Sequence, residues 1–435
     1  DMHDAGDEST HWLVPLRTRM RSGQGSQVAA QADGQQLIVL HQDVLHCLSP
    51  AERQVLWTRP LDVLAGASGF YRQPQREVLP PMQAASVLTG GNRFHPLSRQ
   101  TAAGGMLAVA NSEYLCVYGR RQITVLDPMT GEVRWTHGGL PLGTQVYGNR
   151  DVLFVRPENG SSSYALRALD GRRLEVPNLD ELLAKTVLVA DGGLVLLEER
   201  RSFSFFGLAG GKSVLHLFDP LAEKDRWKRE YSIHAVFSQP GFTTLAALSP
   251  DGALELVDLR SGAATDLGTL TEDDLKSKVQ SFVLLDRNYA YLIVNRSGGN
   301  GGRFHSTNLP VLQVNGGVLA FDRTSGRRLW SQDVRNHHLL WQHATASPVM
   351  LFAANGNVRK GDSYYGELRL LAIDRRTGET LLDDSYHSQY SSSLRWLDVN
   401  LRDRYIELRT YNQRIRLTAV SNEDAPAARP VSQRD

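Results

Sequence analysis

Short runs of alternating apolar residues, each ending at an acidic residue, recur along the chain. The clearest copies share an Asp, a short filler, a Thr-Gly or Ser-Gly pair and a closing Trp or Leu. They are residues 123–135 (ITVLDPMTGEVRW), 318–330 (VLAFDRTSGRRLW) and 368–382 (LRLLAIDRRTGETLL). An apolar run of period two predicts a β-strand with at least one buried face. We expect a second strand, carrying the closing Trp or Leu, to follow each turn.

The residues at the turn favour a β-hairpin. An Asp side chain at the start of a turn accepts hydrogen bonds from backbone N–H groups two residues further on. Gly131, Gly326 and Gly378 supply the positive φ angle that ends such a turn without a clash from Cβ. Because a single hairpin is barely stable in water, we expect several hairpins to pack together.

Weaker copies extend the series. The turn acids lie 39 to 64 residues apart, at positions 127, 170, 219, 258, 322 and 374. Another apolar run precedes each motif, and the period is typical of a repeat architecture with four strands per unit. We count eight units, the last of which, at residues 405–420, is incomplete. Residues 11–17 (HWLVPLR) are predicted to pair with residues 414–420, which would remove the exposed edge of the last unit.

Residues 320–330 and 372–382 carry the most specific form of the motif, in which Ala precedes the Asp by two positions. This sequence pattern resembles that of the PQQ-like (quinoprotein) β-propeller repeat family, whose repeat ends in A-x-D-x-x-T-G-x-x-x-W. The resemblance extends over residues 35–420. It implies an all-β fold, an eight-bladed β-propeller of four-stranded antiparallel blades, with seven blades as the alternative.

The composition, 41% hydrophobic with 38 Gly and 18 Pro, fits one large all-β body. We expect the propeller to occupy residues 11–420, closed by an N-terminal strand, with disordered segments at residues 1–10 and 421–435. Only two short stretches are predicted to be helical, with Asn178 and Thr271 as their N-caps.

The charge pattern excludes some partners. The 48 basic and 47 acidic residues give a formal net charge of +1, so no overall field would attract nucleic acid or an anionic membrane. No apolar run approaches the length of a transmembrane helix, and residues 1–10 are acidic and polar rather than signal-like.

Quinoprotein dehydrogenases of the resembled family use a disulfide between adjacent cysteines, acidic and Asn calcium ligands, and a Trp beneath the quinone. Here Cys47 and Cys116 are 69 residues apart. The Trp residues of the motif, such as Trp135 and Trp330, occupy the repeat position, where we expect them to wedge between blades. PQQ and calcium are therefore disfavoured as cofactors. The two cysteines are expected to be buried thiols, with a disulfide between adjacent blades as the alternative.

Other chemical signals in the sequence are weak. His337, His338 and His343 form the densest imidazole cluster, but adjacent residues on a strand point to opposite faces, which favours polar loop residues over metal ligands. The Gly-rich stretch 297–302 is not followed by a helix, which favours a flexible loop over a phosphate site. No G-x-S-x-G or H-E-x-x-H motif is present. We therefore predict no catalytic, cofactor-binding or metal-binding residue.

Long segments between the predicted strands all map to one face of the propeller, opposite the Asp-Gly turns. These segments are residues 60–104, 198–211, 296–316 and 355–366. Long loops on a rigid scaffold are where binding usually resides. We therefore expect a protein partner to dock on this loop-rich face, near blades six and seven. The candidate contact residues are Arg303, His305, His337, Trp341, Tyr364 and Tyr365.

These patterns favour a non-catalytic β-propeller scaffold or protein-binding module of the cell envelope, in a periplasmic or extracytoplasmic location. Two alternatives remain open. One is a quinone- or metal-dependent dehydrogenase with a degenerate site, and the other is a polysaccharide-binding propeller.

Purified protein mixed with PQQ and calcium should bind no quinone and should not reduce artificial electron acceptors with alcohols or sugars. The reason is the wide separation of Cys47 and Cys116. Absorption spectroscopy after gel filtration checks this. Stoichiometric co-elution of quinone with a spectral shift would show that the dehydrogenase alternative is correct.

Overall fold

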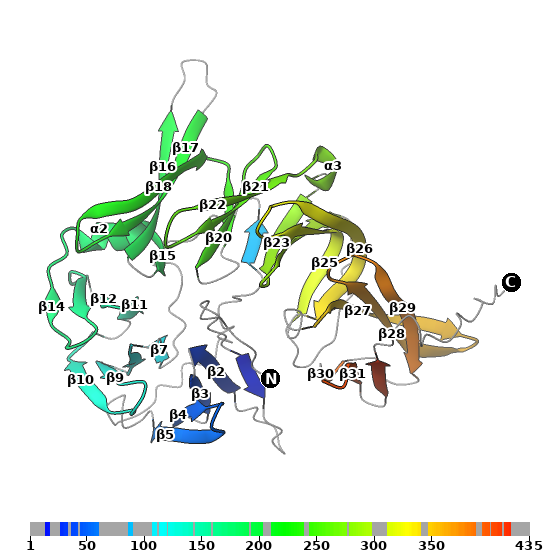
Figure 1. Cartoon of the computed structure of the whole chain (residues 1–435), viewed down its shortest axis with the longest axis horizontal. Coiled ribbons are helices and arrows are strands. Elements are labelled where there is room, and N and C mark those ends of the chain that lie inside the picture. Colours follow the sequence, from blue (N-terminus) through cyan, green and yellow to red (C-terminus); the bar gives the residue numbers. More distant parts are fainter. Residues whose placement is uncertain are drawn as a thin grey trace. The chain divides into compact units, whose positions relative to one another are not determined.

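The computed structural model describes the strands of the chain and most of its tight turns. The described residues are 14–17, 27–33, 36–41, 44–60, 86–89, 107–110, 113–119, 121–141, 144–157, 160–190, 193–202, 210–238, 243–275, 278–297, 311–340, 347–388, 394–400, 402–410 and 413–418. They belong to two compact units, Asp1–Thr269 and Leu270–Asp435 (Figure 1).

The first unit consists of antiparallel sheets that follow one another along the chain. A five-stranded sheet, β1 to β5, precedes four-stranded sheets made of β7–β10, β11–β14, β15–β18 and β19–β22. The elements are β1 (Val14–Arg17), β2 (Gln27–Asp33), β3 (Gln36–His41), β4 (Val44–Ser49), β5 (Gln54–Pro60), β6 (Ser86–Thr89), β7 (Leu107–Ala110), β8 (Leu115–Tyr118), β9 (Gln122–Leu126), β10 (Val133–Gly138), β11 (Gln145–Gly148), β12 (Val152–Arg156), β13 (Tyr164–Arg167), β14 (Arg173–Leu174), α2 (Leu179–Lys185), β15 (Thr186–Ala190), β16 (Gly193–Ser202), β17 (Gly210–Asp219), β18 (Lys224–Ser232), β19 (Val236–Ser238), β20 (Thr244–Leu248), β21 (Ala253–Asp258) and β22 (Ala264–Thr269).

The second unit has longer strands. β23 to β29 lie side by side in chain order, and β30 to β32 form a separate three-stranded sheet. The elements are α3 (Glu272–Leu275), β23 (Lys278–Leu285), β24 (Tyr289–Arg296), β25 (Val311–Asp322), β26 (Arg328–Leu340), β27 (Val349–Lys360), β28 (Ser363–Asp374), β29 (Thr380–Ser388), β30 (Trp396–Asn400), β31 (Tyr405–Arg409) and β32 (Arg414–Thr418). The predicted all-β class is confirmed.

The N-terminal strand pairs within the first unit. β1 pairs with β2, from Val14↔Ala30 to Arg17↔Gln27, and is the fifth strand of the first sheet. β2 is close to β1 along the chain, and a short loop closes at a lower entropy cost than a long one. The closure of the propeller by residues 11–17 and the blade count remain predictions.

The Asp turns form as predicted. Asp127 Oδ1 accepts hydrogen bonds from the backbone N–H groups of Met129, at 2.8 Å, and Thr130, at 3.0 Å. At Asp322, donation from the N–H and hydroxyl of Ser325 lowers the pKa of the carboxyl group. The same pair of backbone bonds is found at Asp219, Asp258, Asp322 and Asp374.

A Trp from one hairpin packs on the turn glycine of a later hairpin. The indole N–H of Trp330 donates to the carbonyl oxygen of Arg375 at 2.9 Å, and its ring covers Gly378. Gly378 has a φ of 76°, and a Cβ there would lie 2.6 Å from the ring. Both the backbone angle and the contact therefore require glycine. In the first unit the same arrangement joins Trp57 to Gly131, Trp135 to Gly171 and Trp227 to Gly262.

A second contact often accompanies the first. The residue two positions after the Trp donates to the carbonyl oxygen of the same glycine in three of these four pairs. The bonds are Arg59 to Gly131 at 2.8 Å, Arg229 to Gly262 at 3.3 Å and Gln332 to Gly378 at 2.7 Å. Each of these glycines is therefore fixed through both its ring contact and its carbonyl group.

The turn between β17 and β18 shows what happens without the Trp. Glu223 occupies its positive-φ position, at 50°. The preceding sheet has Glu175 four residues after Gly171, whereas Trp135 follows Gly131 by the same spacing. A side chain is thus accepted at one Asp turn whose preceding sheet has no Trp. Gly326, with a φ of 71°, also follows a sheet that has Asp266 at the Trp position, so both the turn geometry and the Trp contact favour glycine.

The two cysteines are separate buried thiols. Cys47 lies on β4 and Cys116 on β8, and both have zero exposure. Burial raises the pKa of the Cys47 thiol to about 11 and shifts that of Cys116 further in the same direction. The thiolate forms are therefore disfavoured, and the side chains pack as small apolar groups.

Both predicted N-cap residues lie at the start of their helices. At α3 the hydroxyl of Thr271 accepts from the N–H of Asp274 at 3.2 Å, and the Asp274 carboxylate accepts from the N–H of Thr271 at 2.9 Å. At α2 the N-cap is Asn178, as predicted, but its φ is 53° and its side chain makes no capping bond. The backbone carbonyl of Asn178 accepts from the N–H of Leu182 at 3.0 Å.

Replacing Trp135 or Trp330 with Ala should lower the free energy of unfolding by roughly 3–5 kcal/mol each, since an aromatic contact and a hydrogen bond are lost together. Trp396→Ala is the matched control, because Trp396 is 52% exposed on β30. It should change stability by less than about 0.5 kcal/mol. Urea denaturation measures all three. Equal effects at Trp330 and Trp396 would contradict the structural role.

Candidate partner-binding surface

The segment 355–366, predicted as a loop, is a β-ribbon. β27 and β28 stay in register without interruption from Val349↔Asp374 to Lys360↔Ser363. Gly361, with a φ of 64°, forms the tight turn. The polar residues here lack an apolar stripe, which favours a loop, but cross-strand pairing alone continues the ladder. We call residues 355–366 the ribbon.

The other predicted loops are also shorter than expected. β16 continues to Ser202 and β17 begins at Gly210, with Ser202 paired to Gly210, so this hairpin is extended in the same way (Figure 1). β25 begins at Val311, inside the predicted loop 296–316. Most of residues 60–104 lies outside the described residues. Part of the expected loop face is thus made of hydrogen-bonded strands.

Side chains on the ribbon alternate between its two faces. Arg359 is opposite Tyr364, and Val358 is opposite Tyr365. The Tyr364 ring is 71% exposed. The Arg359 guanidinium donates to the carbonyl oxygen of Gly361 at 2.9 Å, which holds it at the turn. One face of the ribbon therefore presents an exposed aromatic ring beside a fixed cation.

The two adjacent histidines lie on a strand rather than in a connecting loop. β26 runs to Leu340, and His338 pairs with Ala353 of β27. This pairing joins β26 to β27 near the base of the ribbon. Burial, together with the neighbouring His337, lowers the pKa of His338 to about 4, so His338 is neutral at pH 7. A strand places the two rings on opposite faces, and no cluster of metal-ligating side chains occurs among the described residues.

Three of the six predicted contact residues can be located. His337 lies on β26, where its Nδ1 is 2.6 Å from the carbonyl oxygen of Arg335. Tyr364 and Tyr365 lie on the ribbon. His337 and the two tyrosines thus lie on different strands, β26 and β28. The remaining candidates, Arg303, His305 and Trp341, lie outside the described residues.

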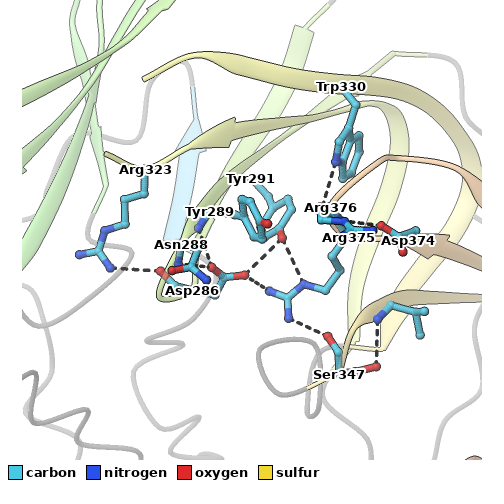
Figure 2. A network of polar contacts seen from close by, with 11 residues as sticks. Asp286, Asn288, Tyr289, Tyr291, Arg323, Trp330, Ser347, Asp374, Arg375 and Arg376 are labelled. Carbon is cyan, nitrogen blue, oxygen red and sulfur yellow. Dashed lines mark hydrogen bonds and ion pairs between the residues drawn. The ribbon is translucent and has the colours of Figure 1, made fainter. Parts of the chain in front are cut away.

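The densest buried polar network of the second unit lies beside the Asp turns (Figure 2). Arg375 is 8% exposed, forms an ion pair with Asp286, and donates to the carbonyl oxygen of Ser347 at 2.8 Å. Tyr291 donates its hydroxyl to Asp286 at 3.2 Å, and its ring lies 5.2 Å from the Arg375 guanidinium carbon. Trp330 donates to the carbonyl of Arg375 itself.

This network is satisfied within the protein. Asp286 Oδ1 also accepts from the N–H groups of Asn288 and Tyr289, at 2.8 and 2.6 Å (Figure 2). Burial raises the pKa of the Tyr291 hydroxyl, which therefore stays protonated as a donor. A buried ion pair with this many partners stabilises the packing of the two turns on which its residues lie. Sequence reasoning missed it, because Asp286 and Arg375 are 89 residues apart.

This chain matches the model of a known protein family and is similar to solved structures. The family model described as "Outer membrane protein assembly factor BamB" matches residues 89–383. One similar solved structure is "Dihydro-heme d1 dehydrogenase NirN in complex with DHE", 12% identical, with a TM-score of 0.31, covering 91% of this chain and 70% of that one. Another is "Crystal structure of the WD40 domain of SCAP from fission yeast", 7% identical, with a TM-score of 0.31, covering 86% and 90%.

No curated protein sequence gives a significant match. Within the part of the chain that the structure describes, no helix is long and apolar enough to cross a membrane.

Proposed function

We propose, on the premise that the chain belongs to the family of the outer membrane protein assembly factor BamB, that it is a non-catalytic β-propeller scaffold. In this proposal it binds protein partners in the periplasm or another extracytoplasmic compartment and supports outer-membrane protein assembly. The ribbon is the docking element.

One observation carries the choice of surface. The ribbon is a hydrogen-bonded continuation of β27 and β28 that presents Tyr364 at 71% exposure beside Arg359. Tyr and Arg are the side chains most enriched at protein–protein contacts, since each offers a large area with a polar end. A ladder fixes them in advance, which lowers the entropy cost of binding.

The opposite turns are less suited to binding. The Asp carboxylates there accept from backbone groups of their own turn, and the nearby Arg375 is buried in an ion pair with Asp286. Polar groups that are already satisfied gain little from a partner. The turns thus act as internal joints, and the ribbon is left as the accessible element.

Site-specific photo-crosslinking in the source cells tests the proposal. A benzophenone amino acid in place of Tyr364 should give a discrete adduct with a second protein. The same amino acid in place of Thr377, which is exposed at an Asp turn, should give none. Both variants should melt at the temperature of the unmodified protein, because neither position is buried.

The outcomes separate the candidate functions. Adducts from position 377 alone, or equal adducts from both positions, would show that the ribbon is not the docking element. The absence of any protein adduct, together with retention of the protein on a polysaccharide matrix that Tyr364→Ala abolishes, would favour the sugar-binding alternative. An exposed Tyr ring is also suited to stacking on a sugar.

A further inference from the structure

Three turns of the second unit are joined by polar contacts (Figure 2). The Arg323 guanidinium donates to the carbonyl oxygen of Asp286 at 3.1 Å, which joins the β25–β26 turn to the β23–β24 turn. The β28–β29 turn is attached through the ion pair of Arg375 with Asp286 and through the bond from Trp330 to the carbonyl of Arg375. These contacts hold the three turns together. We call residues 286–288, 322–328 and 374–379 the turn plate.

The turn plate carries a surplus of positive charge. It contains six arginines and four carboxylates, whereas the whole chain has a formal net charge of +1. Arg287, Arg327 and Arg376 are exposed, one on each turn. Among the described residues, none of these three guanidinium groups takes part in an ion pair. Each turn therefore presents one cation to its surroundings.

The acidic groups of the plate are mostly used within it. Asp322 and Asp374 each accept from two N–H groups of their own turn, and Asp286 is paired with the buried Arg375. The fourth carboxylate, Glu379, is exposed. A small phosphate binds in a turn through backbone N–H groups of this kind. Because the Asp carboxylates already occupy these donors, the exposed arginine side chains are the groups left to bind an anion.

The turn geometry does not require these arginines. Arg376 follows its turn Asp by two positions, where two turns of the first unit have Met129 and Leu221. Arg327 directly follows its turn Gly, where the β9–β10 turn has Glu132. The same kind of hairpin thus forms with an apolar or an acidic side chain at these positions. The arginines are therefore available for a role outside the fold.

The turn plate and the ribbon lie at opposite ends of β28. The plate includes Asp374, the last residue of this strand, and the ribbon includes Ser363, the first. The ladder with β27 is continuous between the two ends. A strand of 12 residues is about 36 Å long. A surface that holds the plate would therefore leave the ribbon facing away from it.

We infer that the turn plate binds the anionic headgroups of a membrane surface. A guanidinium pairs with phosphate through two parallel hydrogen bonds. Three exposed arginines, each on its own turn, match a surface that offers many phosphates. An acidic protein segment is less suited, because the bonded N–H groups of the turns give a peptide backbone few partners.

The attraction is local and weak. The chain as a whole has a formal net charge of only +1, so the cations of the plate act without an overall field. Each cation close to an anionic surface strengthens binding about fivefold, and stable anchoring needs a second signal. The plate would thus orient the protein at a membrane rather than anchor it alone. The inference does not depend on what the ribbon binds.

Co-sedimentation with vesicles tests the inference. The full chain should bind vesicles of phosphatidylglycerol and phosphatidylcholine in equal amounts at low salt, and it should not bind vesicles of phosphatidylcholine alone. Binding should weaken as salt is raised, because the cations are exposed. Sodium phosphate should displace the protein no better than sodium chloride of equal ionic strength, since the arginines recognise a charged surface.

Paired variants locate the site. Arg327→Gln with Arg376→Gln should lower the partition coefficient about 25-fold, at about fivefold for each cation. The control, Arg335→Gln with Arg359→Gln, removes the same charge from exposed positions far from the plate on β26 and on the ribbon. It should change binding less than about twofold, because these positions lie beyond the screening length of salt. Glu379→Gln removes the exposed carboxylate of the plate and should strengthen binding. Unchanged melting temperatures establish that the variants are folded.

A fluorophore reports the orientation of the bound protein. Attached at Thr324→Cys in the plate, it should transfer energy efficiently to a headgroup-labelled lipid. Attached at Ser363→Cys on the ribbon, it should transfer less, because this position lies at the far end of β28. Both positions are exposed, whereas Cys47 and Cys116 are buried and should stay unlabelled.

Several results would overturn the inference. They are the absence of binding to the anionic vesicles at low salt, equal losses in the two paired variants, and equal energy transfer from the two labels. Displacement specific to phosphate would identify a small phosphate ligand instead. Binding of a polyglutamate peptide, but not of vesicles, that Arg327→Gln with Arg376→Gln abolishes would identify an acidic protein segment as the occupant.

Discussion

The contact between an indole ring and a turn glycine is the interaction on which the arrangement of the sheets depends. In the second unit Trp330 covers Gly378 and donates to the carbonyl of Arg375. The ring fills the space where a Cβ would stand, and the N–H satisfies a carbonyl at the turn. One side chain thus ties the β25–β26 hairpin to the β28–β29 turn within one sheet. The first unit repeats the contact three times.

Local chemistry made this part of the structure predictable. The Asp turns, the positive φ of Gly131 and Gly378, and the Trp positions all follow from residues within one short motif. The ribbon was not predictable in the same way, since its polar strands are held by cross-strand pairing and have no buried stripe. Nor was the ion pair of Asp286 with Arg375, whose partners are 89 residues apart in the sequence and meet only in the folded sheet. β2 was missed because its alternating residues are mostly alanines.

For the candidate site, the sequence predicted which segments lie between the strands but not that part of them is itself β-strand. Tyr364 and Tyr365 were selected as loop residues, and they lie on a rigid ladder instead. That difference strengthens the case for binding, because an ordered surface loses less entropy when a partner docks.

The structure divides its polar groups between two tasks. At the turns, carboxylates and carbonyls are used within the protein, and they join each sheet to the next. On the ribbon, the aromatic ring of Tyr364 and the guanidinium group of Arg359 remain accessible. The proposed scaffold function requires both properties: rigid internal contacts and accessible surfaces.

A double-mutant cycle between Trp330 and Gly378 tests the central claim most directly. In the unmodified protein, Gly378→Ala should cost about 1–2 kcal/mol for its backbone angle and about 1–3 kcal/mol more for the clash with the indole. In the Trp330→Ala background only the first cost should remain, which gives a coupling energy of about 1–3 kcal/mol by urea denaturation. Costs that add to within about 0.5 kcal/mol would show that the turn requires glycine by itself and that the contact does not organise the sheets.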